Sequence, residues 1–253
     1  MRVYRPIRTN RISQKFGQNN ACCKVENGKP VRPFKVVVKQ NNTCPVGYTE
    51  FYPSVGLRGH NGTDYMAYSG ENIYFNVDAE TKWYAKTEVD LDGGVGIRVC
   101  SLDPISLKRE DLPPQMSQHA MSYYESQGGK IHVSFLYWHL KDVHLADKPK
   151  VQVGVFANGQ PELLPEIKIG DLIGFADNTG ASSGDHLHHA MKFISKNSMT
   201  VGGDNGYTGA VDMDKWFENL YVLDVVEDVK ERALSAIQYA NWFLFWVRQF
   251  LKK

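Results

Sequence analysis

Glycine and proline constrain this chain more than any other feature, because they interrupt its first two hundred residues roughly every ten positions. Between them lie short runs rich in valine, isoleucine, phenylalanine, tyrosine and tryptophan, which favour strands. We therefore predict a mainly β fold built on an antiparallel sheet. The expected strands are residues 34–39, 72–77, 82–88, 96–100, 131–140, 171–176 and 186–193.

Two stretches are expected to form long surface loops. Residues 102–130 contain an Asp-Pro and a Leu-Pro-Pro sequence, and residues 146–165 contain Asn158-Gly159. Loops of this length in a compact domain often shape a functional site, and otherwise they decorate the surface.

The composition changes after residue 222, because residues 224–253 contain neither glycine nor proline. Apolar side chains recur there at spacings of three and four, which predicts one amphipathic helix. Residues 242–247 (WFLFWV) are apolar around the whole helix circumference. Something must cover them: we expect the parent domain or a partner helix, and the tryptophans and terminal lysines leave a membrane interface as the alternative.

Size and charge limit the function classes. A chain of 253 residues with 42% hydrophobic content can bury a full core. Lys plus Arg (29) nearly cancel Asp plus Glu (28), so we expect no nucleic acid partner. No apolar run of a signal peptide follows the basic start, and no stretch is long enough for a membrane-spanning helix.

The four cysteines follow no metal-binding or disulfide-scaffold spacing. Mostly free thiols are the preferred interpretation. A bridge from Cys44 to Cys22 or Cys23 and a cysteine-bound metal remain as alternatives, and Cys100 stands apart.

Two histidine motifs indicate a metal site. Residues 59–64 read GHNGTD, and the Asn-Gly favours a turn that can bring His60 and Asp64 to one point. Residues 184–189 read GDHLHH, and in a strand His186 and His188 project from the same face. Imidazole nitrogen and carboxylate oxygen are good zinc donors, and three protein ligands leave a position for water. His60, Asp64 and His188 fit that count, although either motif alone is weak evidence.

These motifs occur in an order that resembles the lysostaphin-type, or LytM-like, zinc endopeptidases of bacterial peptidoglycan. The resemblance runs from about residue 11 to 217. Its segments are RISQKFG at 11–17, GLRGHNGTDY at 56–65, LYWHL at 136–140, IGDLIGF at 169–175, NTG at 178–180, SGDHLH at 183–188 and NGYTGAVD at 205–212.

The resemblance implies a zinc metallopeptidase domain over residues 1–222, with a metal-site core at about 45–215 and the helix 223–253 appended. By that resemblance His60, Asp64 and His188 hold Zn²⁺, while His139 and His186 are unligated catalytic histidines. The substrate is then a peptide of peptidoglycan. Without a visible signal peptide, we expect a protein made in the cytoplasm that acts on the wall after lysis, as a phage lysin does, or as a virion component.

Two departures from the family pattern have consequences. His189 and Ala190 replace an aromatic and an acidic residue after His-Leu-His, which leaves a backbone carbonyl to support the His188 ring. The loops at 22–50 and 102–130 are longer than usual, which leaves the cleaved bond open. His189 is expected to be structural or to support a metal ligand, and His119, His132 and His144 are expected to be core histidines.

Two other functions are compatible with parts of this sequence. A zinc carboxypeptidase or amidase of the same polymer fits the His and Asp spacing less well. A non-catalytic wall-binding or scaffold module would use helix 224–253 for self-association, for a virion partner or for contact with a membrane surface.

Overall fold

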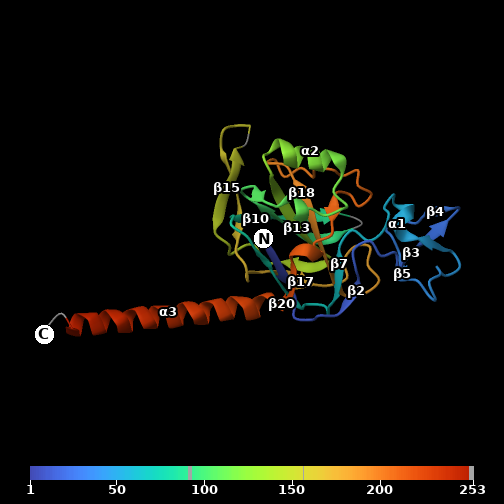
Figure 1. Cartoon of the computed structure of the whole chain (residues 1–253). Helices are drawn as coiled ribbons and strands as arrows, with labels where there is room; N and C mark the ends of the chain where they lie inside the picture. Colours follow the sequence, from blue (N-terminus) through green and yellow to red (C-terminus); the bar gives the residue numbers. More distant parts are fainter. Residues whose placement is uncertain (91–92, 156, 251–253) are drawn as a thin grey trace.

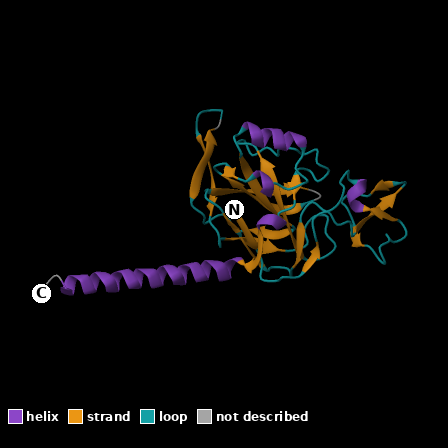
Figure 2. Cartoon of the chain, viewed as in Figure 1, coloured by secondary structure: helices purple, strands orange, loops and turns teal. Residues whose placement is uncertain are grey.

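The computed structural model describes residues 1–90, 93–155 and 157–250, and within these ranges it leaves the side chains of residue 239 and residues 241–250 undescribed. Figure 1 shows a β-rich body from which one long helix, α3 (Val222–Phe250), projects. Strands dominate the body, as the orange arrows of Figure 2 show. The expected mainly β, antiparallel class is confirmed.

One large sheet organises the body. Its strands run in the order β15-β16-β10-β11-β13-β18-β7-β2, every neighbouring pair is antiparallel, and two short strands attach to β13 and β18. The bounds are β2 Ile12–Gln14, β7 Thr63–Met66, β10 Trp83–Asp90, β11 Gly94–Ser101, β12 Ile105–Ser106, β13 Lys130–Trp138, β15 Lys150–Val155, β16 Pro161–Ile167, β18 His186–Ile194 and β19 Ala210–Val211.

Three smaller sheets complete the body, in the orders β20-β1-β9, β14-β17-β8 and β4-β3-β5, with β6 also paired to β3. β1 and β20 form a parallel pair that joins the two ends of the body. The remaining bounds are β1 Arg2–Arg5, β3 Ala21–Glu26, β4 Lys29–Pro30, β5 Val36–Val38, β6 Tyr48–Glu50, α1 Phe51–Ser54, β8 Asn72–Tyr74, β9 Val77–Asp78, α2 Gln118–Ser126, β14 Leu140–Val143, β17 Leu172–Ala176 and β20 Phe217–Tyr221.

Strand periodicity separates the two faces of the large sheet. Phe135, Tyr137 and Phe193 point into the main core and are at most 1% exposed. Each such side chain contributes about 1.5–3 kcal/mol through burial. Leu136 and Trp138, which alternate with them, line a groove on the opposite face. One face of the sheet thus packs in the core and stabilises the fold, while the other face lines the groove.

A small module, residues 20–57, stands beside the groove as β3 to β6 and α1 (Figure 1). A disulfide between Cys22 and Cys44 ties its chain together. The preferred interpretation of mostly free thiols is therefore wrong for this pair, while Cys23 and Cys100 are free and buried. Cys22 and Cys23 are neighbours on β3, so their side chains point to opposite faces of the strand and only one of them reaches Cys44.

Both long stretches expected to be loops contain regular structure. The stretch 146–165 contains β15 and most of β16, which pair as antiparallel strands and extend the large sheet. Residues 102–130 contain β12 and the helix α2, whose first turn is capped by the Ser117 hydroxyl accepting from the Ala120 N–H. Proline in these stretches therefore does not prevent short strands and a short helix from forming.

The expected C-terminal helix is present, and its first residue is Val222. Leu223, Val225 and Val226 pack against Tyr4 and Tyr221, whereas residues 227–238 are exposed. The first turn of the helix therefore docks on the body, whereas the expectation that the body or a partner helix covers residues 242–247 stays a prediction. The apolar segment 242–247 lies outside the residues whose side chains are described.

Among the described residues, no helix combines the length and apolar character needed to cross a membrane.

Candidate active site

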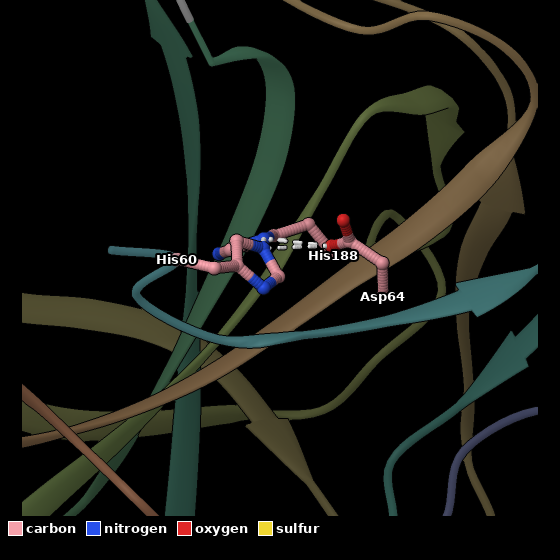
Figure 3. A group of neighbouring side chains, drawn as sticks. All are labelled: His60, Asp64 and His188. Atoms are coloured by element: carbon pink, nitrogen blue, oxygen red, sulfur yellow. Dashed lines mark hydrogen bonds and ion pairs between the residues drawn. The ribbon is translucent and has the colours of Figure 1, made fainter. Parts of the chain in front are cut away.

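Three side chains from two segments of the chain meet at one point (Figure 3), and all three line the groove. His60 lies in the loop before β7, Asp64 lies on β7, and His188 lies on β18. Asp64 and His188 are direct cross-strand partners in the β7–β18 ladder, so the sheet register itself places them together. The predicted zinc-ligand residues thus come together, although 124 residues separate Asp64 from His188.

The three donor atoms form a nearly regular triangle. Nε2 of His60 lies 2.9 Å from Nδ1 of His188 and 3.1 Å from Oδ1 of Asp64, and the third side measures 3.0 Å. Donors at about 2.0–2.1 Å from a tetrahedral zinc ion lie about 3.3 Å apart. A small outward movement of these side chains therefore suffices to admit the ion, so the donor set fits zinc in both chemistry and spacing.

Backbone contacts orient the His60 ring. Its Nδ1 lies 3.2 Å from the carbonyl oxygen of Lys15, and because a carbonyl only accepts, Nδ1 donates to it and Nε2 faces the other two donors. The chain can approach Gly17 this closely only because residue 59 is glycine. An added Cβ on Gly59 would lie 2.4 Å from the carbonyl oxygen of Gly17. The RISQKFG turn and the first metal motif therefore pack backbone against backbone.

The His188 ring is held by packing on its outer edge. A Cβ on Gly62 would lie 2.6 Å from Cε1 and 2.7 Å from Nε2 of His188, so only glycine fits beside the ring. None of the described residues accepts a hydrogen bond from Nε2 of His188. The expectation that a backbone carbonyl supports this ring is therefore wrong for the described part of the chain.

Asp64 is prepared to act as an anionic ligand. Burial opposes its ionisation, but His60, His188 and His186 around it outweigh burial and hold the pKa of its carboxyl well below the ordinary value. Burial, with His60 and His186 adding to it, lowers the pKa of His188 despite its contact with Asp64. The site therefore contains a carboxylate and a neutral imidazole, which are the protonation states that bind metal.

His139 sits beside this site in an unusual backbone conformation. It lies between β13 and β14 at φ 65°, in the left-handed region that costs a non-glycine residue on the order of 1 kcal/mol. Its Nδ1 lies 2.6 Å from the carbonyl oxygen of Thr179 and donates to it, which leaves Nε2 as an acceptor. Burial, with His186 and His188 nearby, lowers the pKa of His139 to about 3, so its ring is neutral.

His186 faces His139 from β18, with the ring centroids 4.5 Å apart. Its Nδ1 lies 2.8 Å from the carbonyl oxygen of Gly184 and therefore donates there. The Nε2 atom lies 3.7 Å from Oδ2 of Asp64, on the side of the predicted metal site. In both predicted catalytic histidines Nδ1 thus donates to a backbone carbonyl, and Nε2 faces the site.

The groove that holds these residues has a volume of about 720 Å³. One wall is apolar and comes from the disulfide-tied module, with Phe34, Val36, Val38, Phe51 and Val55. The floor is the exposed face of the large sheet, and the loop at 181–183 borders the histidines. A groove with one open side admits an extended chain across the site.

The remaining histidines differ in environment. His132 is a core histidine with Nδ1 3.3 Å from the Ser101 carbonyl oxygen, as expected. His119 is exposed and His144 is half-buried beside Asp147, so the expectation is wrong for both. His189 lies on the core face, as the strand period predicted, and stacks against aromatic rings there.

Sequence reasoning missed several groove residues. Trp138 packs over Gly96 on the floor, next to His139. Tyr52 lies against the His60 ring, with centroids 5.7 Å apart. Lys192 lies on the floor, four residues beyond His188. The strand period that grouped His186 with His188 also places Lys192 on that face, so the signal was present.

No protein-family model and no curated protein match this chain. Among solved structures, a mutant catalytic domain of the prophage-encoded M23 protein EnpA from Enterococcus faecalis matches at probability 1.00, with TM-score 0.31 and 16% identity, over 58% of this chain and 77% of that one. A zinc containing peptidase from Vibrio cholerae matches with TM-score 0.31 and 17% identity, over 64% and 31%. The catalytic domain of the antimicrobial peptidase lysostaphin from Staphylococcus simulans matches with TM-score 0.26 and 15% identity, over 58% and 77%. The comparison thus returns peptidases of the type that the sequence motifs resemble.

Proposed function

We propose that this protein is a zinc-dependent endopeptidase that hydrolyses peptide bonds in peptidoglycan, in cross-links or stem peptides. One observation carries the proposal. Three metal donors converge within 4.8 Å of one another, and two further histidines, whose Nδ1 atoms are held by backbone carbonyls, lie beside them in a groove. This combination is what metal-assisted hydrolysis of an amide requires.

Zinc held by His60, Asp64 and His188 would polarise a carbonyl and lower the pKa of a water molecule. Around it, His139 and His186 each present an Nε2 atom that can accept a proton from water. Once protonated, the same nitrogen becomes an N–H donor to the developing oxyanion or to the leaving amine. The carbonyls of Thr179 and Gly184 keep both rings aimed at the site throughout.

The substrate assignment rests on the ordered motifs and on the shape of the groove. An extended peptide placed along the floor crosses the metal site between the apolar wall and the 181–183 loop. Glycine bridges, direct cross-links and stem-terminal bonds all present a similar amide to the metal. We also propose that the protein reaches the cell wall either after lysis, as a phage lysin does, or as part of a virion.

A second function is favoured by α3. Val229, Leu234 and Ile237 are 57–60% exposed on a helix that leaves the body. The alternative is a non-catalytic wall-binding or scaffold module that uses this helix for self-association, for a virion partner or for a membrane surface.

The deciding experiment incubates the zinc-loaded protein with several purified peptidoglycan chemotypes, alongside a chelator-treated sample, and identifies released fragments by mass spectrometry. New amine and carboxylate ends that disappear with chelator establish the endopeptidase and locate the bond. Stoichiometric zinc without any new ends on any chemotype would reject the enzyme and favour the scaffold.

A further inference from the structure

The groove floor carries a second polar cluster, away from the metal site. Sheet register and period place Lys192 on the same face of β18 as His188, and Arg98 of β11 on the same face beside Leu136. Asn61, Glu88 and Thr208 also line the groove here. Four residues at about 3.3 Å each put Lys192 about 13 Å along the strand from His188.

The charges of this cluster do not balance internally. Arg98 donates from Nε and Nη2 to the two carboxylate oxygens of Glu88, which occupies that acid. Nζ of Lys192 makes one hydrogen bond, to the Thr208 hydroxyl at 3.4 Å, and no described carboxylate forms an ion pair with it. Burial, with Arg98 adding to it, lowers the pKa of Lys192 to about 8 and outweighs the attraction of the nearby Glu88 carboxylate. A half-buried ammonium that makes no ion pair is costly for the folded state.

The neighbouring donors point to the missing partner. The Thr208 hydroxyl also accepts from Nδ2 of Asn61, so an amide and an ammonium flank one point of the groove. Among Lys192, Arg98 and Glu88 one positive charge is left over, and this suits a single carboxylate. Polyanions fit poorly, because Glu88, Asp90 and Asp64 line the same groove.

We propose that Lys192, with Arg98 beside it, binds a free carboxylate of the peptide substrate and so selects which peptides lie across the metal site. This rests on the proposed peptidase function and adds a substrate class to it, a peptide with an acidic group several residues from the cleaved bond. The carboxylate comes either from the peptide's C-terminus or from an internal acidic residue.

The test measures binding, so that it does not depend on cleavage. Zinc-loaded full-length protein with His139→Ala is titrated with soluble peptides released from peptidoglycan, and with the same peptides after carbodiimide coupling to ammonia, which converts their carboxylates to amides. Further synthetic pairs are amidated only at the C-terminus or only at the internal acid, which separates the two sources. The same titrations are made with Lys192→Met, Lys192→Arg and, as a matched control, Lys196→Met on the exposed lysine four residues further along.

We expect the carboxylate peptides to bind at least about tenfold more tightly than their amides. Lys192→Met should abolish that ratio while leaving binding of the amides intact, and Lys192→Arg and Lys196→Met should keep it. Equal binding of acid and amide by the parent protein would overturn the proposal, as would an unchanged ratio in Lys192→Met. Absence of cleavage in the wall-digestion experiment would instead reject the peptidase, and a loss of all binding in Lys192→Met with normal thermal unfolding would assign Lys192 to general peptide binding and overturn carboxylate selection.

Discussion

Neighbouring histidines on the two faces of β18 differ in their hydrogen bonding. On the groove face, His186 and His188 each bring a ring nitrogen to within 3.0 Å of an oxygen of the chain. On the core face, His189 is fully buried between Phe135 and Tyr137, and neither ring nitrogen has a partner. The strand period alone separates them. A His-His pair can therefore combine a ligand with a residue that behaves as an aromatic core side chain.

The largest effect is expected from Asp64→Ala, which removes a ligand on the groove face. Zinc binding and hydrolysis should both be lost. Only two of the three protein ligands remain in this variant, and a catalytic zinc site typically needs three. Metal content after gel filtration checks the first result, and digestion of peptidoglycan checks the second. Full zinc occupancy in this variant would remove Asp64 from the proposed ligand set.

His139→Ala separates metal binding from catalysis. The variant should retain zinc and lose rate by a factor on the order of 100 or more, because its Nε2 serves proton transfer and not coordination. Metal analysis and initial rates on one substrate measure both quantities. Wild-type activity in His139→Ala would end the role proposed for this residue.

Gly62→Ala tests the packing of the ligand ring. An added Cβ would lie 2.6 Å from the His188 ring, so the ring must move out of line with the other two donors. Zinc affinity should fall about 10- to 100-fold, as it does when support of a ligand is disturbed. Competition with a chromogenic chelator measures the affinity, and Gly184→Ala, where a Cβ meets nothing within 4 Å, is the matched control.

His189→Phe addresses the core face and should leave zinc binding and rate nearly unchanged. Burial lowers the pKa of His189 from 6.5 to about 3, so the folded state resists its protonation. The stability this provides is complete above about pH 6.5 and is lost as the pH falls toward 3. Between pH 7 and pH 5 the parent should lose about 2 kcal/mol more than the variant.

Urea unfolding at both pH values measures the difference. His119→Gln, at an exposed histidine, should keep the parent's pH dependence. If the free energy of unfolding falls equally in the parent and in His189→Phe between pH 7 and pH 5, protonation of the His189 ring does not destabilise the folded state.

Period-two alternation is a local signal and predicts most of the strands, and two short motifs predict that His60, Asp64 and His188 lie together. The catalytic roles of His139 and His186 rest on the family resemblance and stay predictions. The expectation of a loop is wrong at β15–β16, because Asn158-Gly159 between alternating runs is a strong hairpin signal. The Cys22–Cys44 pairing depends on how β3 is placed, which spacing does not encode. The left-handed backbone of His139 follows from contacts with Thr179, forty residues away.

The register that pairs Asp64 with His188 also fixes when the site can form during synthesis. Two of the three donors are present once residue 64 has left the ribosome, but the third arrives with β18, after three quarters of the chain has been made. A slip of one residue in the β7–β18 ladder would turn His188 to the core side and His189 toward Asp64. The complete donor set is thus present only after the chain has been made as far as β18 and aligned correctly, and a partly synthesised chain lacks it.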